Sequence, residues 1–207
     1  PGDEVLVYPG VYREWVDPVV GGEEGARITY TSVEKGKAII TGAEPVNCWQ
    51  ATDKTGVWVC RVANKIFGDF NPFTEWIFGD WFVANQCKAH RGEVYLNDKS
   101  MYEVFSLEEV ENPVKSKVSW DPEFSVYTWF VEQDEAKDET VIYANFQGKN
   151  PNEEKVEISV RKACFYPSKE GCGYITLSGF TVCKAATQWA PPTAYQEGMI
   201  GPHWSKG

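Results

Sequence analysis

The sequence has 207 residues, a net charge of −10 and an unusually high aromatic content of 14%. This charge excludes a surface that neutralises nucleic-acid phosphates, because such a surface needs clustered Lys and Arg. No apolar run approaches the ~20 residues that a membrane-spanning helix requires, so neither nucleic acid nor a membrane is expected as a partner.

Short β-prone runs joined through a glycine recur in three parts of the sequence. These parts are Val5–Glu14, Ile28–Val46 and Ile175–Val182. The step from Val5 to Ile28 is 23 residues, within the spacing that indicates stacked repeats. A unit this short cannot bury an apolar face alone, so each is expected to stack on the next. We expect Gly42 and Gly179 to occupy equivalent positions, where each glycine eases a tight bend between two strands.

This pattern predicts an all-β solenoid of parallel strands that begins in residues 1–64 and resumes in residues 166–207. The alternative is a β-sandwich, which also uses short strands with frequent turns. The solenoid is favoured because hairpin turns of the Asn-Gly or Asp-Gly type are missing from these segments.

Residues 65–165 follow a different pattern, which begins with the dense aromatic segment Phe67–Phe82. The stretch Glu93–Val104 predicts a β-hairpin that turns at Asn97 and Asp98. After it, Ser106 is the expected cap of a short helical turn, and Glu109 completes a capping box.

A second hairpin is predicted further along, and it joins Ser125–Val131 to Thr140–Asn145 through the acidic turn Glu132–Glu139. The last strand of this region is Val156–Val160. Antiparallel hairpins with apolar and polar alternation predict a small β-sandwich inserted into the solenoid at residues 65–165.

The cysteines form no C-x-x-C pair, and the chain has only two histidines, so the spacing of a zinc site is missing. We expect neither a metal nor a cofactor. The even number of cysteines fits three disulfides, but buried free thiols explain the cysteines equally well. The six positions are Cys48, Cys60, Cys87, Cys164, Cys172 and Cys183.

The stretch Pro1–Glu14 resembles the opening turn of right-handed parallel β-helix proteins of the pectate-lyase-like superfamily, usually of the form G-D-x-[VI]-x-[VL]-x-P-G-x-Y. The stretches His90–Asn97 and Gln188–Gly207, together with the inserted sandwich, are similar to glycoside hydrolase family 120, the β-xylosidases. The resemblance covers essentially the whole chain. It implies the start of a right-handed parallel β-helix with an inserted antiparallel β-sandwich of immunoglobulin-like type.

The resemblance also implies an activity, that of a retaining β-xylosidase on xylo-oligosaccharides, with an Asp nucleophile and a Glu acid/base. In that family the two carboxylates lie on later turns of the helix, and we expect this chain to end before them. No residue here therefore inherits a catalytic role. The chain is expected to supply one wall of the cleft that binds an oligosaccharide or polysaccharide, and to be inactive alone.

A cluster of aromatic and polar residues near the end of the sequence is the candidate substrate-binding surface. Sugars stack their apolar faces on aromatic rings, and polar side chains orient their hydroxyls. For any single Trp, packing of a loop onto the solenoid is the simpler interpretation, and Glu197 is at most an acceptor that orients substrate. The expected residues are Trp189, Gln196, Glu197, His203, Trp204 and Lys206.

Two other features are weighed in the insertion. His90 and Arg91 are a candidate functional pair, although a salt bridge from this hairpin edge to Glu93 or Glu103 explains them more simply. The aromatic segment before them either reaches over a sugar cleft or fastens the insertion to the solenoid, and we favour the second role.

Three functional classes stay open. The chain belongs to a glycosidase, to a polysaccharide lyase of the same fold, or to a non-catalytic scaffold for adhesion. The inserted sandwich is also expected to be able to join copies into a homo-oligomer. The protein is expected to be soluble, but the sequence does not distinguish a cytoplasmic from a secreted protein. An isolated 207-residue chain is expected to expose apolar faces near Met199 and Ile200, and to aggregate or be poorly stable.

Overall fold

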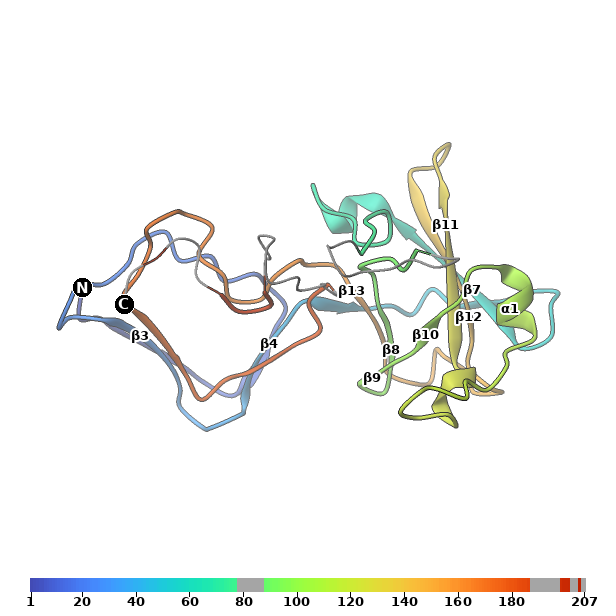
Figure 1. The fold of residues 1–207 in the computed structure, drawn as a ribbon, viewed down its shortest axis with the longest axis horizontal. Helices are drawn as coiled ribbons and strands as arrows, with labels where there is room; N and C mark the ends of the chain where they lie inside the picture. Colours follow the sequence, from blue (N-terminus) through green and yellow to red (C-terminus); the bar gives the residue numbers. More distant parts are fainter. Residues whose placement is uncertain (78–87, 187–197, 202–204, 206–207) are drawn as a thin grey trace. The chain divides into compact units, whose positions relative to one another are not determined.

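A computed structural model describes residues 1–77, 88–186, 198–201 and 205, and this part of the chain is mostly β-structure (Figure 1). The chain divides into two compact units. The first, which we call the parallel unit, consists of Pro1–Ala43 and Arg161–Gly207. The second, the insertion unit, consists of Glu44–Val160.

The parallel unit contains two three-stranded sheets, β1-β3-β14 and β2-β4-β15, in which every pair is parallel. In the first sheet Val5 pairs with Tyr30, and Tyr30 pairs with Leu177. The chain thus passes the same place three times and runs in the same direction each time. The strands are β1 (Glu4–Val7), β2 (Gly10–Tyr12), β3 (Ile28–Ser32), β4 (Ala38–Thr41), β14 (Ile175–Ser178) and β15 (Thr181–Cys183).

A third parallel ladder continues these passes as single bridges, from Val16 to Phe165 and from Phe165 to Ile200. The first pass therefore runs through β1, β2 and Val16. The second runs through β3 and β4 and reaches its third ladder only at Phe165. The insertion unit leaves the second pass directly after β4 and returns to it before Phe165.

The expectation that Gly42 and Gly179 are equivalent is wrong. The strand before Gly179 is β14, which pairs with β3, whereas the strand before Gly42 is β4, which pairs with β15. Gly179 has a φ of 77°, a left-handed conformation that glycine adopts without strain. Gly42 instead packs so tightly that an added Cβ would lie 2.6 Å from the Cα of Ala185. The two glycines permit their turns for different physical reasons.

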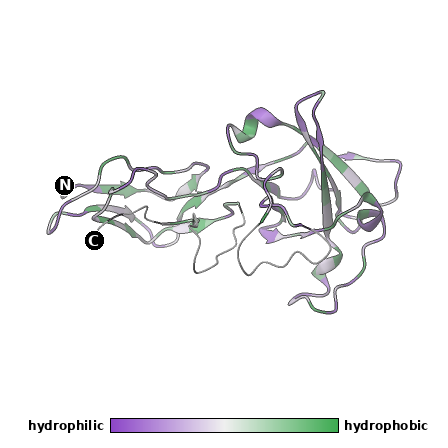
Figure 2. Ribbon diagram, turned by 45° about the horizontal axis from the view of Figure 1, so that its top comes forward, coloured by the Kyte–Doolittle hydropathy of each residue, from purple (hydrophilic) through white to green (hydrophobic). Residues whose placement is uncertain are grey.

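The core of the parallel unit is small and centres on Ile40, Cys164, Phe165 and Ala185, which are all buried. The ring of Tyr30 meets that of Phe165 edge to face, with centroids 5.1 Å apart. In both units hydrophobic stretches coincide with strands and the loop tips are more hydrophilic (Figure 2). Apolar side chains of successive passes thus stack on one another, which is how such short strands are stabilised.

The insertion unit contains two further sheets. A five-stranded sheet has the order β10-β11-β12-β7-β6, and a four-stranded sheet has the order β5-β13-β8-β9. All pairs whose direction is established are antiparallel except β10 with β11. The strands are β5 (Ala43–Pro45), β6 (Gln50–Ala51), β7 (Val57–Ala63), β8 (Val94–Leu96), β9 (Lys99–Ser100), β10 (Tyr102–Glu103), β11 (Thr128–Asp134), β12 (Glu139–Asn145) and β13 (Val156–Ser159).

The two sheets of the insertion unit share one core. Alternate residues of the long strands point into it, such as Trp129 and Val131 of β11 and Ile142 and Ala144 of β12. The same cluster contains Ile158 of β13 from the other sheet. A period of two residues places one face of each strand against this core, which explains why apolar and polar residues alternate in the sequence.

Both predicted hairpins of the insertion are confirmed. In the first, β8 and β9 turn at Asn97 and Asp98, whose φ values of 51° and 69° fit a two-residue hairpin turn. The second joins β11 to β12 over seven residue pairs, and its turn is shorter than the predicted Glu132–Glu139, because Glu132, Gln133, Asp134 and Glu139 belong to the paired strands. The Ser106 cap is confirmed as well, because its hydroxyl accepts a hydrogen bond from the Glu109 backbone N–H. The Glu109 carboxylate reaches back one residue further than a capping box requires and accepts from the Phe105 backbone N–H. The short helices are α1 (Leu107–Glu111), η1 (Asn64–Phe67) and η2 (Phe124–Val126).

The insertion unit begins earlier in the chain than the predicted boundary at residue 65. The sequence predicts that residues 1–64 belong to the solenoid, yet β7 pairs with β12 along its full length, from Val57 opposite Asn145 to Ala63 opposite Glu139. The apolar run of β7 does not reveal its partner, because the same residues suit a parallel or an antiparallel neighbour. Residues 161–165 return to the parallel unit.

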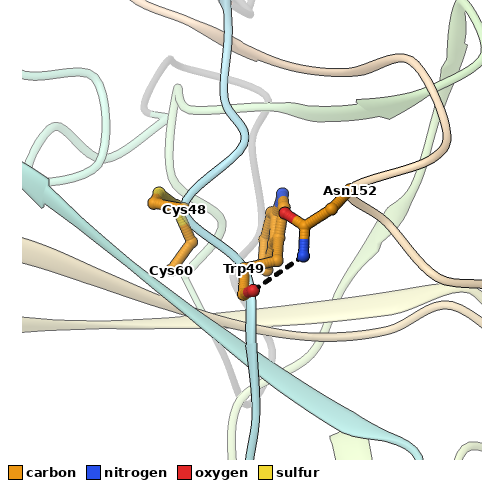
Figure 3. Close-up of a disulfide and its surroundings, with 4 residues drawn as sticks. All are labelled: Cys48, Trp49, Cys60 and Asn152. Atoms are coloured by element: carbon orange, nitrogen blue, oxygen red, sulfur yellow. Dashed lines mark hydrogen bonds between the residues drawn. A yellow bond between two sulfur atoms is a disulfide. The ribbon is translucent and has the colours of Figure 1, made fainter.

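Cys48 and Cys60 form a disulfide whose Cα atoms are 5.1 Å apart, next to Trp49 in the insertion core (Figure 3). The Asn152 side-chain amide donates a hydrogen bond of 2.9 Å to the Trp49 carbonyl and ties the β12–β13 connection to this segment. Disulfide and free thiol, which the sequence left open, therefore both occur. Cys164 and Cys172 are buried thiols, Cys183 is a half-buried one, and Cys87 lies outside the described residues.

Candidate functional site

The six residues predicted to bind substrate lie outside the part of the chain that the structure describes. Trp189, Gln196, Glu197, His203, Trp204 and Lys206 therefore stay a prediction. The described residues contain a different candidate, which lies in the insertion unit.

This candidate is a pocket of about 250 Å³, which we call the Trp76 pocket. Phe, Trp and Val side chains form its apolar walls, and its polar groups are two carboxylates, an amide, an imidazole and an ammonium group. Strand β11 supplies four consecutive lining residues, and Glu103 comes from the neighbouring β10. The lining residues are Phe73, Trp76, Lys88, His90, Glu103, Val104, Phe105, Phe130, Val131, Glu132 and Gln133.

Trp76 and His90 are brought together by the backbone. They form an isolated antiparallel bridge, and it is flanked by a 2.8 Å hydrogen bond from the Ile77 N–H to the Ala89 carbonyl. Their rings stack with centroids 3.8 Å apart and planes 29° from parallel. Trp76 is nevertheless 42% exposed as a residue, so it is not enclosed by the stack.

Glu103 fixes the orientation of His90 through both carboxylate oxygens. One oxygen lies 2.5 Å from His90 Nδ1, and the other accepts a 2.8 Å hydrogen bond from the His90 backbone N–H. Both side chains are largely buried. The predicted pairing of His90 with Glu103 is thus confirmed as a hydrogen-bonded contact. The Arg91 guanidinium lies over the Phe70 ring, with its Cζ 4.8 Å from the ring centroid.

The arrangement suits binding better than catalysis. Both oxygens of Glu103 are engaged by His90, so this carboxylate is not poised to attack or protonate a substrate. The pocket instead offers flat apolar walls with polar groups around them. That combination fits a small ring-shaped molecule with hydroxyl groups, whose apolar face meets an aromatic side chain and whose edge forms hydrogen bonds.

No group of three or more His, Cys, Asp or Glu side chains that could hold a metal ion occurs among the described residues. In the same residues, no helix has the length and apolar character needed to cross a membrane.

Sequence reasoning found the pair at the centre of the pocket but not the pocket itself. It singled out His90 with Glu103, and separately the aromatic segment that contains Trp76. It did not predict that Trp76 contacts His90. The two residues are fourteen positions apart and pair through a single isolated bridge, and the sequence between them carries no hairpin-turn signal at a spacing that would pair them. The contribution of β11 depends on how the strands of the sheet are ordered, which the residue pattern does not reveal.

Comparison with known proteins now identifies the family. A sequence profile described as the insertion domain of glycoside hydrolase 120 matches residues 46–158, nearly the whole insertion unit. The chain is also similar to a solved structure described as the complex structure of XylC with xylose, with 46% sequence identity and a TM-score of 0.90. The match covers 97% of this chain and 33% of that chain. No curated protein matches the sequence.

Because the profile covers more than half of the sequence, the chain belongs to the glycoside hydrolase 120 family. It spans about a third of the length of the XylC structure.

Proposed function

We propose that this chain is part of a glycoside hydrolase that acts as a retaining β-xylosidase on xylo-oligosaccharides. The observation that carries this proposal is the 46% identity to XylC, a protein whose structure was solved with xylose, over 97% of this chain. The chain spans only a third of XylC, so the activity is proposed for the whole protein. The two catalytic carboxylates are proposed to lie in the remaining part.

We propose that the parallel unit is the start of a right-handed parallel β-helix, and that the insertion unit is a β-sandwich of immunoglobulin-like type. Three passes of the chain joined by three parallel ladders support the first proposal. Two sheets with one common core support the second. The insertion is placed in the connection that follows β4 in the second pass. Connections between strands tolerate insertions without disturbing the pairing of the strands themselves.

The sugar cleft of the whole protein is proposed to be lined in part by Trp189, Gln196, Glu197, His203, Trp204 and Lys206. Rings that stack on the sugar and side chains that orient its hydroxyls remain the supporting argument. Substituting Trp189 or Trp204 by Ala in the whole protein should raise KM for a xyloside more than it lowers kcat, if these rings bind ground state and transition state alike.

The insertion unit is also proposed to join copies into a homo-oligomer. Its loop at residues 113–120 presents Val114, Val118 and a fully exposed Trp120 to solvent. The loop is ordered by its own bonds, since the Ser116 hydroxyl accepts the N–H groups of Val118 and Ser119. An ordered loop with exposed Trp and Val is typical of protein interfaces. Light scattering of the Trp120→Ser variant tests this: a mass unchanged from wild type would contradict it.

The test of the function is the activity of the whole protein on chromogenic xyloside, arabinoside and glucoside substrates, and on polygalacturonate with and without calcium. Release from the xyloside is expected. An unsaturated product from polygalacturonate without glycoside cleavage would replace the proposal by a polysaccharide lyase. No turnover of any substrate would favour a non-catalytic scaffold.

A further inference from the structure

We propose that the Trp76 pocket of the insertion unit is a binding site for a single uncharged pyranose ring, with xylose as the ring it takes. The site is separate in sequence from the substrate residues proposed at positions 189–206, and Glu103 within it serves binding, not cleavage. The choice of xylose as the ligand rests on the proposed function. The argument from the shape and charge of the pocket is independent of that function.

The size of the pocket limits the ligand to about one ring. Its volume of about 250 Å³ lies just below the range of roughly 300–1,000 Å³ found for sites that hold drug-sized molecules. An oligosaccharide could therefore place one terminal ring inside while its other rings stay outside. The walls of Phe73, Phe105 and Phe130 are apolar, which favours the C–H faces of a pyranose over a fully polar ligand.

The aromatic platform is held in place before any ligand arrives. Glu103 fixes His90 by two contacts, and the His90 ring supports the Trp76 ring at 3.8 Å. Because this chain of contacts already restricts the ring plane, little side-chain entropy remains to be lost on binding. Phe105, at 44% exposure, adds a second accessible ring at the same pocket.

Polar groups around the platform can bond hydroxyls. The Gln133 amide nitrogen lies 3.5 Å from the Phe73 carbonyl, a weak contact that it can exchange for a ligand oxygen. Lys88 Nζ lies over the Trp76 ring, 5.9 Å from its centroid, and can donate to the hydroxyl of a ligand at this ring. The Glu132 carboxylate is an acceptor on the exposed side. A sugar hydroxyl both donates and accepts, so it satisfies all three groups.

Charge selects against acidic sugars. Residues 44–160 carry 21 Asp and Glu against 11 Lys and Arg, whereas the rest of the chain carries 9 of each. The whole net charge of −10 therefore resides in the insertion unit. The pocket itself is lined by two carboxylates, Glu103 and Glu132, and by one ammonium group, that of Lys88, so its lining is net acidic as well. A uronic acid would be repelled by this field, while xylose has no charge and would not be.

The test is ligand-observed NMR titration of the whole protein with xylose, xylobiose and glucuronic acid, in wild type and in the pocket variants, so that binding at the substrate cleft is the same background in every sample. Xylose and xylobiose are expected to bind, and glucuronic acid at least about tenfold more weakly. Trp76→Ala should weaken xylose binding about tenfold or more. Phe105→Ala should weaken it too, and provides a second reading if Trp76→Ala fails to fold. The matched control is Tyr8→Ala, which removes another exposed aromatic ring, in the parallel unit.

The outcomes separate this proposal from the proposed function. No binding of xylose to the whole protein, or equal affinity of wild type and both pocket variants, would overturn the pocket proposal even if the whole protein cleaves xylosides. Equal binding of glucuronic acid and xylose would overturn the stated selectivity. If xylose binding depends on Trp76 while the whole protein cleaves no xyloside, the site stands and the hydrolase function fails.

Discussion

Reduction of the Cys48–Cys60 disulfide should weaken the insertion unit without affecting the parallel unit. The bond closes a segment with a sequence separation of 12. A crosslink over a segment of this length lowers the entropy of the unfolded chain by an amount worth about 3 kcal/mol at 25 °C. With a urea dependence of about 1.5 kcal/mol per M for a unit of this size, the midpoint should fall by about 2 M on reduction.

The assay is urea unfolding followed by tryptophan fluorescence, with and without a reducing agent. Six of the nine Trp residues lie in residues 44–160, so the signal reports mainly the insertion unit. The Cys48→Ala/Cys60→Ala double variant is the control, because its midpoint should not respond to the reducing agent. A wild-type midpoint that is the same under both conditions would refute the reasoning.

Three further predictions concern the cores and a buried thiol. Ile142→Ala should lower the free energy of unfolding by about 2–5 kcal/mol in urea denaturation, because this side chain is fully buried between the two sheets; a loss below about 1 kcal/mol would contradict the shared core. Gly42→Ala should lower the free energy of unfolding by about 1–3 kcal/mol, because the added Cβ clashes with the backbone of Ala185. The control is Gly25→Ala, whose added methyl group has no atom within 4 Å and should cost only the strain of its positive φ. Equal losses of stability for the two variants in thermal melts would show that the lack of space at Gly42 is not the cause. Burial raises the pKa of Cys164 to about 12, so this thiol should resist iodoacetamide at pH 8 until urea unfolds the chain. The contribution of the buried thiol to the free energy of unfolding should be lost as the pH rises from about 9 to about 12, because only the unfolded chain releases the proton in that range. Rapid labelling of the native protein, read by mass spectrometry, would contradict the burial.

Local features of the fold were predictable from the sequence because their causes are local. The turn at Asn97 and Asp98 uses two residues that tolerate a positive φ, and the Ser106 cap needs only Glu109 three positions later. The contact of His90 with Glu103 was also predictable, since the two residues lie only 13 positions apart in the sequence. Each of these features depends on residues within about fifteen positions of one another.

The pairing of distant strands was not predictable in the same way. The apolar run of β7 suits a parallel neighbour as well as an antiparallel one, so only the contact with β12 showed that the insertion unit begins before residue 65. Gly42 and Gly179 share a local pattern, yet the register of β14 against β3 places them at different points of the chain's passes.

The sequence by itself determined that the chain is a β-protein, where its hairpins turn, and which family it resembles, because turn chemistry, alternation and motif identity are written in neighbouring residues. Only the tertiary structure decided which strands pair, that the insertion interrupts the second pass, and that Trp76, His90 and Glu103 meet β11 around one pocket. Those facts depend on contacts between residues far apart in the chain. Many pairings satisfy the same local preferences, and the packed cores select among them.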